Sequence, residues 1–158
     1  MAVYAYGEPD SVNDKQFIYD SLVNQKISRF LWSWFHDCDL NRLKNIPRAQ
    51  MTPEELTAWD HGKRLLEFRP SDWIIHKHIP EYRKMTAVRL LSEYFYQPTL
   101  PAPGTDGRQC FHIDKIFTFD RDDKRVDPVL CKKLKLKGSL YQIHDEKEFY
   151  KSLCNLYL

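Results

Sequence analysis

Large apolar residues alternate with polar ones in several short stretches of the chain, and each such stretch predicts a β-strand. The clearest is residues 28–35, where period two places the rings of Phe30, Trp32 and Trp34 on one face. In residues 110–119, the same period places Lys115 on the side of the apolar residues Ile113 and Phe117. The predicted strands are residues 2–6, 28–35, 73–78, 85–95, 110–119 and 139–144, and the third and fourth are expected to form a hairpin.

Helices are predicted over residues 14–24, 52–68 and 145–156. The second has a typical helix start, with Thr52 as the cap, Pro53 in the first turn and Glu55 three residues after the cap. Gly62 weakens this helix locally. Its expected core residues are Leu56, Trp59, Leu65 and Leu66. Residues 97–108, which hold prolines and glycines, predict a long loop, and residues 120–128 predict a charged turn.

This mixture of strands and helices in 158 residues predicts a single α+β domain over residues 1–158 with one core. Aromatic residues make up 14% of the chain, a high share that requires a use in packing or recognition. The cysteines are scattered without a close pair and the N-terminal residues lack a signal-peptide pattern, which predicts a cytoplasmic location. No apolar run approaches the roughly 20 residues that cross a bilayer, so no membrane partner is expected.

Charge is distributed unevenly, although the net charge is only +2. Among the charged residues of positions 1–25 the acidic ones predominate, whereas among those of positions 124–137 the basic ones predominate. The basic residues are Lys124, Arg125, Lys132, Lys133, Lys135 and Lys137. Such a run forms either a solvated face or a surface for phosphate groups, so any nucleic-acid binding must come from local patches.

Familiar metal and nucleotide motifs are missing from the sequence. Neither cysteines at zinc spacing nor His-Glu-x-x-His occurs, and the run of residues 120–123 lacks the glycine and glutamate of a calcium loop. His76 and His78 would share a strand face, but a metal site there needs Cys110 or His112 as well. No phosphate-cradling glycine loop is present. We therefore expect no metal and no cofactor.

The triplet Asp145-Glu146-Lys147 leaves an enzymatic alternative open. Beside an upstream carboxylate such as Asp114, Asp120 or Asp127, it could hold magnesium in a small metal-dependent nuclease, with the lysine orienting water. The same triplet arises in the first turn of an ordinary helix, because acids there interact favourably with the helix dipole.

Two blocks, residues 28–35 and 70–78, combine large rings with polar and basic side chains. Rings stack on unpaired bases for roughly 1–3 kcal/mol each, while arginine or lysine holds phosphate groups. A flipped or modified base needs a pocket of this composition. The alternatives are tryptophans that pack the core, with at most one block lining a pocket, and exposed rings that anchor a protein partner.

The order of these elements resembles the PUA-like superfamily and, within it, EVE-like readers of modified nucleobases. The resemblance rests on the tryptophan-rich strand of residues 29–34, a helical insertion, the turn and strand of residues 69–76, and the strands of residues 86–95 and 111–116. It covers about residues 1–145. Many members have a glycine before the aspartate of that turn, where this chain has Ser71.

The resemblance implies an α+β fold with a mixed, partly open β-barrel of the PUA-like type and flanking helices. It also implies a non-catalytic module that binds DNA or RNA through a modified or flipped base. A separate effector protein is a further expected partner, since family members often work beside a nuclease or methyltransferase domain. The implied pocket residues are Trp32, Ser33, Trp34, Trp73 and Tyr94, and the implied phosphate contacts are Arg29, Lys77 and Arg89.

Overall fold

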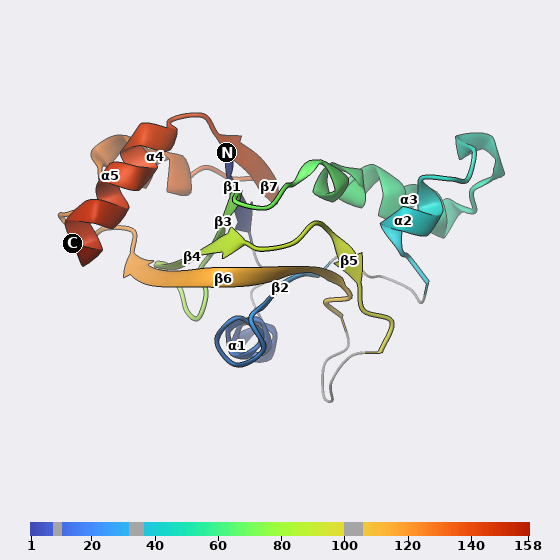
Figure 1. Ribbon diagram of the computed structural model, residues 1–158, viewed down its shortest axis with the longest axis horizontal. Helices are drawn as coiled ribbons and strands as arrows, with labels where there is room; N and C mark the ends of the chain where they lie inside the picture. The colour runs from blue at the N-terminus through green and yellow to red at the C-terminus, as the bar shows by residue number, and fades with distance from the viewer. Residues whose placement is uncertain (8–10, 32–36, 100–105) are drawn as a thin grey trace.

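The computed structural model describes residues 1–7, 11–31, 37–99 and 106–158, which contain a seven-stranded mixed sheet (Figure 1). The strand order is β2-β6-β4-β3-β1-β7, and β5 also pairs with β6. Within these ranges β1 runs parallel to β3, and the other pairs are antiparallel. The strands are β1 (Val3–Gly7), β2 (Ile27–Phe30), β3 (Trp73–Lys77), β4 (Lys84–Leu90), β5 (Phe95–Tyr96), β6 (Gln109–Asp120) and β7 (Leu140–Ile143).

The long strand β6 joins two parts of this sheet. Residues 109–112 pair with β2 on one edge, residues 109–110 pair with β5 on the other, and residues 113–120 pair with β4. The sheet curls along β6 into a half-barrel with helices at its sides (Figure 1). The predicted α+β fold with a partly open barrel and flanking helices is confirmed.

Helices cover both faces of the sheet, so the described residues form two apolar clusters where one core was expected. In β1, Tyr4 and Tyr6 belong to one cluster, and Val3 and Ala5 to the other, as period two requires. The first face carries α1 (Val12–Asp20), the π-helical turn η1 (Ser21–Gln25), α2 (Leu40–Leu43), α3 (Pro53–Gly62) and the 3₁₀ turn η3 (Lys63–Glu67). The second carries α4 (Pro128–Leu134) and α5 (Glu146–Tyr157).

The predicted helix start at Thr52 is confirmed. Its hydroxyl accepts from the Glu55 backbone N–H at 3.2 Å, and the Glu55 carboxylate accepts from the Thr52 N–H at 3.0 Å. The last residue of α3 is Gly62, and the Leu40 side chain packs closely against it. A larger residue would not fit there, because its Cβ would lie 2.9 Å from the Leu40 side chain. Of the expected core residues Leu65 is fully buried, while Leu56, Trp59 and Leu66 are half-buried.

The turn before β3 needs a residue in the left-handed conformation, which glycine adopts most easily. Ser71 has φ 77° and adopts this conformation despite its side chain. Its N–H donates to the Leu90 carbonyl at 2.8 Å. The Asp72 carboxylate accepts from the N–H of Arg69 at 2.9 Å and from that of Ala2 at 2.8 Å, which ties the turn to the start of β1.

The alternation expected for residues 110–119 is wrong, because β6 contains a bulge. Leu90 pairs with Ile113 and Arg89 with Lys115, which leaves Asp114 as an extra residue. The bulge reverses the phase of the strand. As a result Phe111 and Ile113 belong to the first cluster, whereas Phe117 and Phe119 face the second.

Other element boundaries differ from those predicted. The strand expected over residues 85–95 ends at Leu90 and resumes as β5, and the first helix passes into η1 after Asp20. The described part of the 28–35 strand ends at Phe30, and residues 32–36 lie outside the described residues, as do residues 100–105 of the predicted loop. Within the described ranges, no helix is both long and apolar enough to span a membrane.

Candidate functional site

Trp73, Arg89 and Lys115 lie side by side on three adjacent strands, because Trp73 pairs with Arg89 and Arg89 pairs with Lys115. Together with α5 they line a cavity of about 430 Å³. The remaining lining residues are mainly apolar or aromatic: Met1, Phe117, Tyr150, Leu153, Cys154, Tyr157 and Leu158. The structure thus brings together two predicted site residues, Trp73 and Arg89.

The rings of this cavity differ in how much of their surface is free. Trp73 is 5% exposed, and its ring centre lies 6.0 Å from that of Phe117 and 5.3 Å from that of Phe149. The Trp73 ring is therefore mainly a packing residue that borders the cavity. Tyr157 packs on Phe117 at 4.8 Å between ring centres and is 42% exposed. The accessible ring for stacking is consequently that of Tyr157.

Two cationic side chains, Arg89 and Lys115, line the cavity, and the Asp114 carboxylate pairs with the first of them. Arg89 forms two hydrogen bonds with Asp114, of which the Nε–Oδ1 bond is 2.9 Å. This pairing raises the pKa of Arg89 and lowers that of Asp114, in both cases mainly through the hydrogen bonds. Lys115 is exposed and has no ion pair within the described ranges, so the site favours an anion.

Tyr150 places a polar group in this apolar surrounding. Its hydroxyl oxygen is buried and has no hydrogen-bond partner of ordinary geometry in the described part of the chain. Burial raises the pKa of the Tyr150 phenol, while the neighbouring Trp73 side chain lowers it by a smaller amount. The Tyr150 hydroxyl is therefore a covered polar group in the wall of the cavity, next to the Trp73 side chain.

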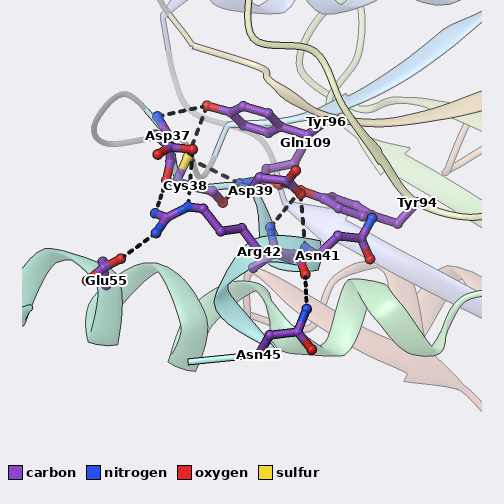
Figure 2. Close-up of polar contacts among 11 residues, drawn as sticks. Asp37, Cys38, Asp39, Asn41, Arg42, Asn45, Glu55, Tyr94, Tyr96 and Gln109 are labelled. Atoms are coloured by element: carbon purple, nitrogen blue, oxygen red, sulfur yellow. Dashed lines mark hydrogen bonds and ion pairs between the residues drawn. The ribbon is translucent and has the colours of Figure 1, made fainter. Parts of the chain in front are cut away.

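A second set of polar side chains holds the chain on either side of residues 32–36, with Tyr94 and Gln109 at its centre (Figure 2). The Leu40 N–H donates to the Tyr94 hydroxyl at 3.1 Å, and this hydroxyl donates to the Gln109 side-chain oxygen. The Gln109 amide nitrogen then donates to the Cys38 carbonyl at 3.0 Å. Tyr94 and Gln109 are almost completely buried, and burial raises the pKa of the Tyr94 phenol.

Two more tyrosines and an arginine complete this network. The Leu31 N–H donates to the Tyr6 hydroxyl at 3.0 Å, and the Asp37 N–H donates to the Tyr96 hydroxyl at 3.2 Å. Arg42 then links Asp37 to Glu55 of α3, with a 2.8 Å bond to the Glu55 carboxylate (Figure 2). The network therefore holds the backbone of Leu31 and of residues 37–40, and Tyr94 has a structural role in it.

Arg29 and Lys77, both predicted to contact phosphate, are buried among neutral partners. The Arg29 guanidinium donates to Ser21 Oγ at 2.7 Å, to Gln25 at 2.8 Å and to the Gly107 carbonyl at 3.0 Å. Gly107 has φ 101°, a conformation that suits glycine. Burial lowers the pKa of Arg29. Both phosphate contacts stay predictions, but this position does not expose the Arg29 guanidinium to a phosphate.

Lys77 lies at the end of β3 and is 5% exposed. Its Nζ donates to the Leu136 carbonyl at 2.8 Å and to the Tyr141 hydroxyl at 3.2 Å, and it lies 4.7 Å from the centre of the Tyr141 ring. Burial lowers the pKa of Lys77, with nearby Arg121 as the smaller cause. Trp32, Ser33 and Trp34, the other predicted pocket residues, lie outside the described residues.

The residues considered for metal chemistry are used in other ways. His76 is fully buried against Ser28, with 2.7 Å between Nε2 and Oγ, while His78 lies beyond the end of β3. Asp127 caps α4 and pairs with Lys151, and Asp145 lies 3.9 Å from Lys133. Across the described ranges, no group of three His, Cys, Asp or Glu residues is placed to hold a metal ion.

The sequence analysis missed Lys115, Tyr150 and Tyr157. A charged residue in the apolar phase of a strand was the available signal for Lys115, because it stands between Ile113 and Phe117. The two tyrosines belong to the predicted helix of residues 145–156 or follow it directly, and only the packing of α5 on the sheet shows which rings reach the cavity.

No protein-family model and no curated protein sequence matches this chain. Among solved structures, the NMR structure of Rpa0253 from Rhodopseudomonas palustris is similar to it, with a TM-score of 0.46 and 14% sequence identity. That similarity covers 100% of this chain and 95% of the other.

Proposed function

We propose that this chain is a non-catalytic nucleic-acid-binding module of the PUA-like, EVE-like kind, which binds an unpaired, flipped or modified base. The observation that carries the proposal is the cavity of about 430 Å³ that Tyr157, Arg89 and Lys115 line together. This volume is within the range of small-ligand pockets, ~300–1,000 Å³. Its mixture of rings and cations suits a base that carries a phosphate.

Each part of the cavity has a role in this proposal. A base stacks on the exposed Tyr157 ring, and the Tyr150 and Trp73 side chains form the apolar wall beside it. Lys115 and Arg89 lie at the position of the phosphate. The Asp114 carboxylate holds Arg89 in place and reduces the net charge, so Lys115 contributes most of the attraction.

The proposal includes a cytoplasmic location, supported by the scattered cysteines of the sequence, and a separate effector protein, supported by the resemblance alone. Trp32 and Trp34 stay as the predicted pocket of the other tryptophan block. The Tyr6, Tyr94, Tyr96 and Gln109 network supports that prediction to the extent that it fixes the backbone on both sides of those residues.

The test is fluorescence anisotropy of labelled single strands and modified duplexes at low salt, where phosphate contacts are strongest. Tyr157→Ala and Lys115→Ala are expected to weaken binding, whereas Trp34→Ala leaves it unchanged if the cavity is the site. Loss of binding in Trp34→Ala alone would move the site to the other tryptophan block. Absence of binding by every strand at low salt would overturn the proposal.

A further inference from the structure

We propose that the cations around Asp122 form a surface that binds the phosphate backbone of a single-stranded nucleic acid. The proposal rests on the proposed function, because the same strand would place one base in the cavity beneath α5. The surface, called here the Asp122 cluster, consists of Tyr82, Arg83, Arg121, Asp122 and Lys135.

Three cations share the Asp122 carboxylate in this cluster. The distances to its oxygens are 3.0 Å from Arg83 Nε, 3.3 Å from Lys135 Nζ and 3.6 Å from Arg121 Nε. A second carboxylate, that of Asp120, approaches Arg83 at 3.7 Å. The three cations exceed the two carboxylates by one positive charge, while the Arg121 Nε is itself buried. A phosphate oxygen is the acceptor that such an excess of donors favours.

The cluster is held in place by its backbone. The Arg121 N–H donates to the Arg83 carbonyl at 3.1 Å, and the Asp122 N–H donates to the Asp120 carboxylate at 2.8 Å. The Arg83 and Lys135 side chains remain about half exposed. Two cations are therefore accessible, Arg83 in the connection between β3 and β4 and Lys135 at the C-terminal end of α4, and their shared carboxylate already holds them in place.

An exposed ring lies beside these cations. Tyr82 is 67% exposed, its ring is stacked on His78 with 5.0 Å between centres, and the Arg121 guanidinium lies 5.5 Å from its centre. The ring is thus supported from within the protein and still presents surface to solvent. Aromatic rings between cations are the usual arrangement in proteins that bind single strands without sequence preference.

The cluster is connected to the cavity along β6. Tyr157 lines the cavity and also a neighbouring hollow of about 240 Å³, which Lys84, Asp120 and Arg125 border. Asp120 in turn contacts Arg83 of the cluster. From Lys115 to Arg121 the strand direction covers about 20 Å, at ~3.3 Å per residue. A strand of several nucleotides can therefore reach both places at once.

The experiment compares a twelve-nucleotide single strand with a mononucleotide. In the double variant Arg83→Ala/Lys135→Ala, the affinity for the long strand is expected to fall about tenfold, with a salt slope shallower by ~0.7 for each phosphate interaction that the substitutions remove. Mononucleotide binding is expected to stay unchanged. The matched control is Lys44→Ala/Lys63→Ala, which removes the same charge near α2 and α3 at the other end of the molecule (Figure 1). An equal loss in both double variants, or no loss in either, would overturn the inference.

Thiol alkylation gives a second readout that separates the two sites. Cys131 Sγ lies 3.6 Å from the Asp122 carboxylate, Cys154 lines the cavity, and Cys38 and Cys110 are buried. The long strand is expected to slow alkylation of both Cys131 and Cys154, and the mononucleotide that of Cys154 alone. Protection of Cys154 without Cys131 by the long strand overturns this inference and leaves the proposed function standing. Failure of both ligands to bind overturns the proposed function itself.

Discussion

Arg29 and Arg89 were predicted to play the same part, yet they lie in regions of opposite character. Around Arg29, as around Tyr94 and Gln109, buried donors and acceptors are matched to one another. Around Arg89, the cavity leaves Tyr157 exposed and the Tyr150 hydroxyl without a partner. The same residue types thus build the fold in one region and a binding surface in the other, and the hydrogen-bond partners distinguish them.

The largest test of this difference is the pair of variants Arg29→Met and Arg89→Met. Arg29→Met leaves three acceptors without their donor and is expected to lower the free energy of unfolding by about 3 kcal/mol. Arg89→Met is expected to leave stability nearly unchanged, because the Arg89–Asp114 pair is at the surface. Urea unfolding measures both, and equal losses would remove the distinction between the two regions.

A smaller effect is expected from removing one hydroxyl in each region. Tyr94→Phe leaves the Leu40 N–H and the Gln109 oxygen unpaired in the interior and should cost about 2 kcal/mol. Tyr150→Phe removes a hydroxyl that has no hydrogen-bond partner of ordinary geometry within the described ranges, and it should change stability by much less than Tyr94→Phe. Thermal unfolding of the two variants side by side is the measurement. A large loss in Tyr150→Phe would show that its hydroxyl is paired in solution.

The buried His76 predicts a loss of stability in acid. Burial lowers its pKa from an unfolded value near 6.5 to about 3, so the unfolded state binds the extra proton between these values. Stability contributed by neutral His76 is therefore present above pH 6.5 and decreases as the pH falls, by up to about 1.4 kcal/mol per pH unit. Unfolding curves between pH 7 and pH 5 test this. A His76→Asn variant with an undiminished pH slope would assign the acid sensitivity to other groups.

The smallest expected change in stability belongs to Lys115→Ala. Lys115 is exposed, so the free energy of unfolding should not change measurably. Nucleotide binding should weaken, and the salt slope should fall by about 0.7 if Lys115 interacts with one phosphate. Unchanged binding at low salt would separate the cavity from nucleic-acid recognition.

The sequence was sufficient for the class of fold, because period-two strands and the Thr52 capping box act locally. The burial of Arg29 could not be predicted, since one of its partners, Gly107, lies 78 residues further along the chain. The bulge at Asp114 could not be predicted from the alternation of apolar and polar residues either, because apolar residues on both faces of β6 hide the change of phase. These two features decide which predicted site residues meet.

The left-handed Ser71 turn and the Asp72 carboxylate anchor the sheet, but the bulge at Asp114 determines which side chains face α5. If β6 kept Asp114 but paired without the bulge, unbroken alternation would turn Phe117 and Phe119 toward the opposite face. A deletion among the paired residues between Lys115 and Phe117 would turn these rings as well, whereas deletion of Asp114 itself would leave them in place. In any comparison with related chains, a gap placed opposite Asp114 would mark a protein that reaches the same arrangement of rings beneath its last helix with an unbroken strand.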